Sequence, residues 1–354
     1  MPLPLTISRL FVRLSTRVLM VFLVVVMLAV LIGTAIPTAL TAYVSPDKQF
    51  QEVPNRLHIM DAARGLAGKV VSQIVNCCVF WSPDGTRVAF NGGDRRPYIW
   101  DQRDNTLHPV GEPGLGGTII DWSPDGTALL ETVYQPDGNA GHYALYRLDL
   151  ESGLPTQLTF FDAPIIYGTD WSPDGRFLIF AAKQNGDWDI YRIESDGGQL
   201  QRFHDPVGDA IAPQVSPDSR EIAFTLSGQG RVELYKMRVD GSGPQQLTWT
   251  DGIEYSPRWS PDGQQILFGT AGVTPDTSQI YAINADGSGL RQLTDDDNRA
   301  KLVRWCWLPD GSHILYETSD QTVAELYVMD IRDNTARRLL RNTLTNFLNS
   351  ACQP

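Results

Sequence analysis

The sequence predicts an all-β protein, a β-propeller of four-stranded blades with one N-terminal transmembrane helix, and three observations support this prediction. The first is a turn motif, Trp-Ser-Pro-Asp-Gly, that recurs along the chain. The second is a pair of shorter motifs, Ile/Leu-Tyr and Gln-Leu-Thr, that follow the turn in a constant order. The third is an uncharged, mostly apolar run near the N-terminus, over residues 18–40.

The turn motif recurs with the period of a structural repeat. The full copies are Trp81–Gly85, Trp122–Gly126, Trp171–Gly175 and Trp259–Gly263, and the degenerate copies are Val215–Ser219 and Trp307–Gly311. Their first residues stand at positions 81, 122, 171, 215, 259 and 307, so successive copies are 41 to 49 residues apart. A period of roughly 40–50 residues is typical of repeat architectures such as solenoids and propellers.

Each repeat contains the signals of four short strands. Serine, proline and glycine at the first, second and fourth turn positions favour a type I turn closed by a left-handed residue, which joins two strands of a hairpin. The residues after the turn, as in Phe177–Phe180, read as a half-buried strand. Ile190-Tyr191 is typical of the third strand and Gln246-Leu247-Thr248 of the fourth. Four short strands without a helical period between them predict a propeller blade.

Together these motifs resemble the WD-like repeats of the TolB-type β-propeller family over about residues 70–340. The resemblance implies a propeller fold and a habit of binding proteins, but it implies no reaction, because a fold does not determine a function. TolB proteins carry an α/β domain ahead of the propeller. Residues 1–55 leave no room for such a domain, so we expect it to be missing.

The number of blades has two interpretations. Six ordered copies of the turn predict six full blades. Arg56–Asp61 resembles the third strand of a further blade, and Gly68-Lys69-Val70 could begin its fourth strand. Leu344–Ser350 could then supply an inner strand, giving a seventh, composite blade closed by both termini. The alternative is a six-bladed ring with an N-terminal strap.

The apolar run Val18–Leu40 is long enough to cross a membrane. At about 1.5 Å per residue its 23 residues reach roughly 34 Å, against a bilayer core of about 30 Å. Arg9, Arg13 and Arg17 precede the run and acidic residues follow it, so the positive-inside rule places the N-terminus in the cytoplasm.

The expected organisation follows from this run. We expect a basic cytoplasmic segment over residues 1–17, a signal-anchor helix over 18–40, a linker over 41–55 and the propeller over 56–354. The chain would be a single-pass protein of a bacterial-type cell membrane, with the propeller on the extracytoplasmic side. The alternative is a signal peptide cleaved near Ala35 or Ala42, although signal-peptide apolar regions are usually shorter, about 7–15 residues.

The composition of the chain limits the kinds of molecule that it can bind. The chain has 29 basic and 41 acidic residues, a net charge of −12, and the three arginines ahead of the apolar run make the remainder still more acidic. Such a surface repels nucleic acid, so we expect no nucleic-acid partner. Four cysteines, Cys77, Cys78, Cys306 and Cys352, lie in a part of the chain where export would permit disulfides. A bridge from Cys352 to another of them would fasten the ring, and unpaired buried thiols are the alternative.

The chain lacks the sequence motifs of common enzymes. It contains no Gly-x-Ser-x-Gly, Gly-x-Gly-x-x-Gly or His-Glu-x-x-His motif. No Cys-x-x-Cys pair indicates zinc, and the turn aspartates suit their turns by bonding nearby backbone. We therefore name no catalytic residue, metal site or cofactor.

The connections between blades carry the candidate binding residues. In a propeller these connections share a face with the loops between second and third strands, and they open beside the central channel. Four of them contain an acidic residue, three with an aromatic neighbour. The candidates are Asp162, Asp205, Asp251, Asp296, Phe161, His204 and Trp249. A ring of carboxylates there would attract a cation or a basic peptide end. Solvated aspartates that cap their loops are the alternative.

Three functions are compatible with this sequence. The first is a membrane-anchored, extracytoplasmic module that binds or scaffolds a protein or peptide. The second is a propeller enzyme that acts on glycans or peptides through carboxylates at the channel mouth, which would need a pair about 5–9 Å apart in a deep pocket. The third is a sensor of a cation or small ligand, which for a cation needs several converging oxygens. The missing motifs favour the first without deciding whether the chain is an enzyme.

Overall fold

The computed structural model describes residues 40–45, 56–61, 66–71, 75–111, 117–137, 140–160, 166–184, 186–203, 208–228, 230–271, 278–294, 301–319, 324–342 and 348–352. These residues form 28 strands, β1 to β28. Within them, no helix has the length and apolar character that crossing a bilayer requires. The predicted transmembrane segment, 18–40, lies outside the described residues apart from Leu40, which begins a strand.

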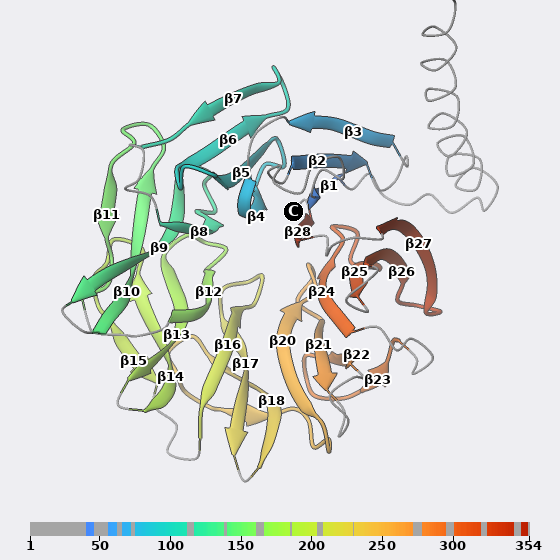
Figure 1. Cartoon of the computed structure of the whole chain (residues 1–354). Helices are drawn as coiled ribbons and strands as arrows, with labels where there is room; N and C mark the ends of the chain where they lie inside the picture. The colour runs from blue at the N-terminus through green and yellow to red at the C-terminus, as the bar shows by residue number, and fades with distance from the viewer. Residues whose placement is uncertain are drawn as a thin grey trace, which may run out of the picture.

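Six antiparallel sets of four strands follow one another along the chain. The first two are β4 (Val75–Trp81), β5 (Arg87–Gly92), β6 (Pro97–Asp101), β7 (Thr106–Pro109), and β8 (Thr118–Trp122), β9 (Ala128–Asp137), β10 (Ala140–Asp149), β11 (Pro155–Gln157). The next two are β12 (Ile166–Trp171), β13 (Phe177–Gln184), β14 (Asp187–Glu194), β15 (Gln201–Phe203), and β16 (Ala210–Val215), β17 (Glu221–Gly228), β18 (Arg231–Arg238), β19 (Gln245–Gln246). The last two are β20 (Ile253–Trp259), β21 (Gln265–Ala271), β22 (Ser278–Asn284), β23 (Arg291–Gln292), and β24 (Lys301–Trp307), β25 (His313–Ser319), β26 (Ala324–Asp330), β27 (Thr335–Asn342). The sets stand as blades around a ring (Figure 1).

Both ends of the described chain build a seventh blade. Its strand order is β28-β1-β2-β3, with β1 (Leu40–Ser45), β2 (Arg56–Asp61), β3 (Leu66–Val71) and β28 (Leu348–Cys352). Strand β28 pairs antiparallel with β1, so that Thr41 lies opposite Cys352. The blue strands β1–β3 therefore lie beside the orange and red strands β24–β27 (Figure 1). Of the two predicted arrangements, the structure has seven blades.

Strand β1 lies where the sequence predicts a linker. It occupies Leu40–Ser45, ahead of the expected start of the propeller at residue 56. Its apolar residues continue the preceding apolar run, which hides the boundary, yet Tyr43 and Val44 are residue types that favour strands. The C-terminal strand also begins at Leu348 rather than at Leu344. The predicted propeller boundary therefore omits one strand of the composite blade.

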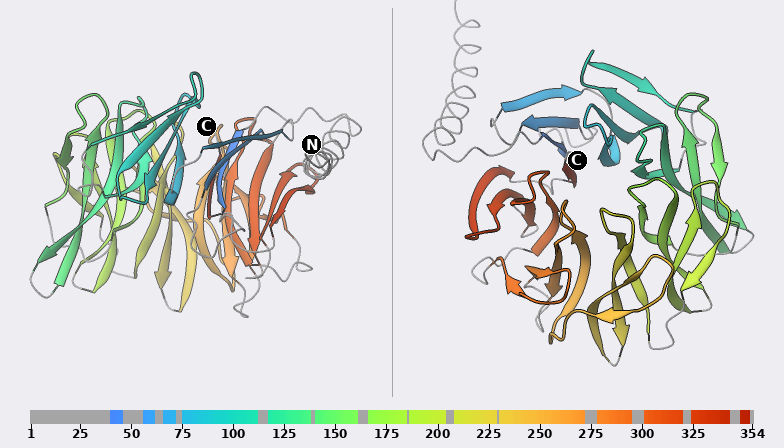
Figure 2. Two further views of the ribbon diagram at one scale, coloured as in Figure 1. Left: turned by 45° about the horizontal axis from the view of Figure 1, so that its top comes forward. Right: turned by 180° about the vertical axis from the view of Figure 1, so that it is seen from behind.

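Backbone hydrogen bonds define two faces of the ring. The turn between the third and fourth strands bonds to the turn between the first and second, as in Ser195 N–H to the Arg176 carbonyl at 2.8 Å and Ala285 N–H to the Gln264 carbonyl at 2.8 Å. We call the side that carries these turns the turn face. The loops between second and third strands and the connections between blades lie at the other ends of the strands, on what we call the connection face. Figure 2 shows the strands running between the two faces.

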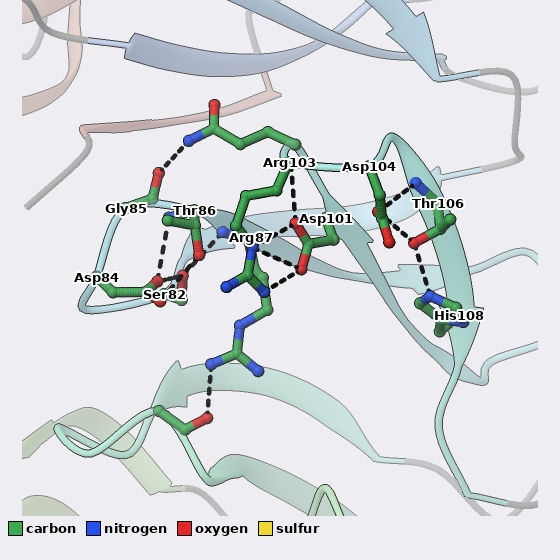
Figure 3. A network of polar contacts seen from close by, with 12 residues as sticks. Ser82, Asp84, Gly85, Thr86, Arg87, Asp101, Arg103, Asp104, Thr106 and His108 are labelled. Carbon is green, nitrogen blue, oxygen red and sulfur yellow. Dashed lines mark hydrogen bonds and ion pairs between the residues drawn. The ribbon is translucent and has the colours of Figure 1, made fainter.

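The Trp-Ser-Pro-Asp-Gly motif is a self-contained turn. In the first copy, Ser82 Oγ accepts the N–H of Arg87 at 2.9 Å and donates to Asp84 Oδ1 at 2.5 Å, while Gly85 N–H donates to the Ser82 carbonyl at 2.8 Å (Figure 3). The tryptophan ties neighbouring blades together, since Trp122 Nε1 donates to the Phe80 carbonyl at 2.9 Å. The turn aspartates are thus used by the turns, as predicted.

The predicted left-handed turn residues are confirmed. Their φ angles are positive in all six copies: Gly85 64°, Gly126 67°, Gly175 73°, Ser219 61°, Gly263 69° and Gly311 63°. Serine tolerates this conformation less well than glycine. Ser219 has a compensating contact, because its Oγ accepts the N–H of Asp174 in the neighbouring blade at 3.1 Å.

A pair of substitutions tests the turn geometry. Gly175→Val should lower the free energy of unfolding by more than about 1 kcal/mol, because a β-branched residue fits positive φ poorly. A Cβ atom at this position would meet no heavy atom within 4 Å beyond the adjacent residues, so the expected effect comes mainly from the backbone. Ser219→Gly should change stability by less than about 0.5 kcal/mol, because relief of strain offsets the lost hydrogen bond. Urea unfolding of both variants measures this, and equal effects at the two sites would contradict it.

The two shorter motifs serve one hydrogen-bond arrangement at the outer side of three blades. Tyr235 packs against Phe224 in a tilted pair with ring centroids 5.9 Å apart, and its hydroxyl donates to Gln246 Oε1 at 2.8 Å. Gln246 Nε2 donates to the carbonyl of Thr248 at 2.7 Å, and Thr248 Oγ1 accepts the N–H of Leu234 at 2.9 Å. The Tyr and Gln-Leu-Thr motifs therefore bind the third strand to the fourth, which explains why they recur together.

Candidate binding face

Exposed aromatic side chains gather on the connection face. The described aromatic residues with large exposed areas are Tyr134, Tyr143, Phe160, Tyr167 and Trp249. Their exposed fractions run from 37% for Tyr143 to 78% for Phe160. They lie in the hairpin between β9 and β10, in connections between blades or at the start of β12, all of which belong to the connection face. The turn face exposes large aliphatic residues instead, at Leu154, Leu200 and Leu290.

Local structure holds part of this aromatic group in place. Strands β9 and β10 are ten residues long each, and near their shared end Tyr134 contacts Tyr143 edge to face at 5.3 Å between ring centroids. Tyr167 contacts Trp188 in the same manner at 6.5 Å. Such pairs reduce the freedom of the exposed rings, which lowers the entropy cost of ordering them against a partner.

Two of the predicted binding residues lie in the described part of the chain. Trp249 is 70% exposed, and the Asp251 carboxylate pairs with the guanidinium of Arg231 at 3.0 Å, with both side chains exposed. Arg231 follows the loop between β17 and β18, so this pair joins two loops of the connection face. An exposed ion pair of this kind contributes about 0–1 kcal/mol. The other candidates, Asp162, Asp205, Asp296, Phe161 and His204, lie outside the described residues, and the predicted carboxylate ring stays a prediction.

Two buried carboxyl groups support the connection that carries Trp249. Glu254 Oε2 lies 2.5 Å and Glu233 Oε2 lies 3.0 Å from the hydroxyl of Thr248. Thr250 donates its N–H to Glu233 Oε2 at 3.1 Å and its hydroxyl to Glu254 Oε1 at 3.1 Å. The residues on both sides of Trp249 are thus fixed to the same pair of carboxyl groups, while the indole points to solvent.

Burial favours a proton on Glu254. The Thr248 hydroxyl has one hydrogen, so it cannot donate to both Glu233 and Glu254. A protonated Glu254 can donate in the contact that the hydroxyl does not serve. Burial raises the pKa of Glu254 to about 7, the charge of Glu233 raises it further, and the hydrogen bonds from Thr248 and Thr250 oppose the shift. The hydrogen bonds that hold the residues on both sides of Trp249 should therefore change as the pH passes through neutrality.

Sequence reasoning did not find Glu233 and Glu254. Both lie on strands, and Glu233 stands directly before the Leu234-Tyr235 motif, next to the buried Leu234. The sequence does contain one signal that could have indicated such a residue. A polar residue also stands directly before the Ile/Leu-Tyr motif in another blade, where it is Gln279. Across the described ranges, no group of three or more His, Cys, Asp or Glu side chains is placed to hold a metal ion.

Comparisons with known proteins agree with the fold. Residues 204–346 match the family model of the TolB beta propeller domain, and residues 66–101 match that of the WD domain, G-beta repeat. An uncharacterized protein of Agrobacterium fabrum is 28% identical over 167 residues, which are 35% of this chain and 57% of that protein. The match thus spans little more than half of that relative's length.

Solved structures with the same fold come from several kinds of protein. Putative TolB from Agrobacterium tumefaciens has a TM-score of 0.52 at 22% identity over 73% of this chain and 88% of its own. TolB from Acinetobacter baumannii has a TM-score of 0.55 at 16% identity, over 90% and 83%. An oligogalacturonate lyase from Vibrio parahaemolyticus has a TM-score of 0.57 at 15% identity, over 84% of each chain. At such identities these likenesses show the fold alone. The match of residues 204–346 to the TolB beta propeller domain, together with the repeated turns, supports a propeller of the TolB type.

Proposed function

We propose that this propeller binds a protein or peptide partner through its connection face. The observation that carries the proposal is the gathering of exposed aromatic side chains on that face. Tyrosine and tryptophan are enriched where proteins meet, since they bury large areas with few rotatable bonds. A partner that covers Phe160 and Trp249 would remove this surface from water.

The charge of the chain favours a basic partner segment. The net charge is −12, and Asp251 contributes one carboxylate on the connection face. The predicted ring would add Asp162, Asp205 and Asp296, with Phe161 and His204 beside them. Opposite charges across an interface raise the association rate and exclude wrong partners. The proposed partner therefore presents lysine or arginine together with apolar side chains.

Paired substitutions test this function. The full-length protein, solubilised from membranes, is used to capture partners by cross-linking and mass spectrometry, and the affinity for a captured partner is then measured. Trp249→Ala combined with Phe160→Ala should weaken that affinity at least tenfold, because aromatic anchors commonly contribute 2 kcal/mol or more. The control, Leu154→Ala with Leu200→Ala on the turn face, should leave the affinity unchanged. Equal retention by both double variants would contradict the assignment of the face.

We also propose that residues 18–40 anchor the chain in the membrane, with residues 1–17 in the cytoplasm and the propeller outside. The support is the length of the apolar run and the three arginines ahead of it. The full-length protein should stay in the membrane pellet after carbonate washing, and external protease should reach the propeller. A mature N-terminus found near residue 36 or 43 would instead mean that a signal peptide is cleaved.

A further inference from the structure

The inner strands of five consecutive blades enclose a cavity of about 450 Å³. It extends from Thr118 and Tyr167, near the connection face, to residues that directly precede the turn motifs. Three of its lining residues are charged, namely Asp121, Asp170 and Arg258. A cavity of this volume matches small-molecule sites, which occupy roughly 300–1,000 Å³.

One side of the cavity is acidic. Asp121 on β8 and Asp170 on β12 lie on neighbouring inner strands, and backbone N–H groups hold both in place. Asp121 Oδ1 accepts the N–H of Trp122 at 2.8 Å, and Asp170 Oδ2 accepts the N–H of Val215 in the next blade at 2.8 Å. The two carboxyl groups are therefore fixed in position before any ligand arrives.

The environment keeps both carboxyl groups from ionising easily. Burial raises the pKa of Asp121 to about 8, and the charge of Asp170 adds to this rise. Burial also raises the pKa of Asp170 to about 6, against the hydrogen bond from Val215 and the charge of Arg258. The charge of Arg258 lowers the pKa of both carboxyl groups from a distance, without a hydrogen bond to either. Among the described residues, the acidic side therefore has no cation in direct contact.

The opposite side of the cavity is basic. Arg258 lies on β20, separated from β8 by the inner strands β12 and β16. Its Nη1 donates to the Pro257 carbonyl at 3.1 Å, and within the described residues no carboxylate forms an ion pair with its guanidinium. Burial lowers the pKa of Arg258 and the charge of Arg304 on β24 adds to this, while the charges of Asp170 and Asp121 on the other side of the cavity oppose the shift. Arg258 lies among other residues of the ring, yet its side chain is exposed to solvent in the cavity.

We propose that this cavity binds a small zwitterion of the α-amino-acid class, with its ammonium group at Asp121 and Asp170 and its carboxylate at Arg258. A simple anion would be repelled by the acidic side of the cavity, and a simple cation would be repelled by Arg258 and Arg304. A molecule with both charges satisfies both sides, because an ammonium relieves the repulsion between two carboxylates and a guanidinium binds a carboxylate in a planar pair. The site is separate from the proposed partner face and does not depend on it.

Binding should also release protons at neutral pH. An ammonium group beside Asp121 favours its ionised form, so a carboxyl group that holds a proton in the free protein gives it up. The protons released per ligand can be measured by titration calorimetry in two buffers of different ionisation enthalpy. A ligand that binds without the acidic side would release none.

The test uses the full-length protein in detergent and the twenty L-α-amino acids, first by thermal shift and then by calorimetry. At least one amino acid should bind saturably, while acetate and methylamine bind at least a hundredfold more weakly. Asp170→Asn and Arg258→Gln should each weaken that binding at least tenfold, whereas Glu151→Gln at an exposed position of the turn face should not change it. Arg258→Lys replaces the glutamine variant if the latter fails to fold, and it should also bind at least fivefold more weakly.

Several results would overturn the proposal. These are the absence of any saturable amino-acid binding, acetate or methylamine binding as tightly as the amino acid, or unchanged binding in both the Asp170 and Arg258 variants. The assay does not involve Trp249 or Phe160. A failure here therefore leaves the partner-binding proposal standing, and loss of partner capture in the aromatic double variant leaves this one standing.

Discussion

Reduction of the disulfide bond at Cys306 should lower the free energy of unfolding by about 2–4 kcal/mol. Cys306 is disulfide-bonded in the structure, so the alternative that all four cysteines are unpaired thiols is wrong. It lies on β24, the inner strand of the last full blade, which contacts β28 of the composite blade. Its partner is one of Cys77, Cys78 and Cys352, whose side chains lie outside the described part of the structure. Any of the three closes a long loop, and such a cross-link destabilises the unfolded chain.

Urea unfolding with and without a reducing agent measures this effect. Cys306→Ser in oxidising buffer should reproduce the loss, and the reducing agent should then cause little further change. Peptide mapping without reduction identifies the partner cysteine. Unchanged stability on reduction, or the same response to reducing agent in the serine variant, would contradict the expected role of the bond in holding the ring.

The turns and strand motifs could be predicted because their chemistry is local. Ser82, Asp84 and Gly85 satisfy one another within a few residues, so their types and spacing suffice to predict the turn. The same logic predicted positive φ at Ser219, where the glycine is missing. Strand β1 could not be predicted in this way, because it pairs with β28 at the far end of the chain, with Thr41 opposite Cys352. Such a register depends on how the ring closes.

The carboxyl groups of the interior were missed for a related reason. Glu254 and Asp170 read in the sequence as polar positions on strands, which normally face solvent. In the ring, Glu254 is covered by the connection that carries Trp249, and Asp170 lines the central cavity. Their burial depends on neighbouring blades that lie tens of residues away. The exposed aromatic residues were partly predictable, since Trp249 follows a Gln-Leu-Thr motif and must therefore lie in a connection.

Glu131 is the most unusual of these interior groups. In five blades an aromatic ring of the second strand packs against one of the third, as in Phe180 with Tyr191 at 5.5 Å and Phe268 with Tyr281 at 5.8 Å. In the blade β8–β11, the second strand carries Glu131 where the other blades carry an aromatic residue. Glu131 lies opposite Tyr146 on the third strand. Its side chain is buried at 2% exposure, and its Oε1 has no hydrogen-bond partner among the described residues. A buried carboxylate in this position destabilises the fold.

Stability should therefore fall as the pH rises through neutrality, and Glu131 should cause a measurable part of the fall. Burial raises its pKa to about 7, against a hydrogen bond from the N–H of Gly117. The unfolded chain has a glutamate pKa of about 4.3, so the folded state binds the extra proton between these values. The stabilisation is complete below about pH 4 and is lost progressively as the pH rises from there through about 7, by about 4 kcal/mol in all.

Glu131→Gln isolates this contribution, because it keeps the shape of the side chain and removes its titration. Urea unfolding at pH 5, 6, 7 and 8 should show the wild type losing about 2–3 kcal/mol more than the variant over this range. The two proteins should be closest in stability at pH 5, where Glu131 is protonated, since the other raised carboxyl groups, Asp121, Asp170 and Glu254, titrate in both. The exposed Glu151 of the same blade supplies the control, and Glu151→Gln should follow the wild type at every pH. Parallel pH profiles for the wild type and Glu131→Gln would mean that the Glu131 carboxylate is hydrated in the folded protein, because only access to water removes the cost of ionising it there.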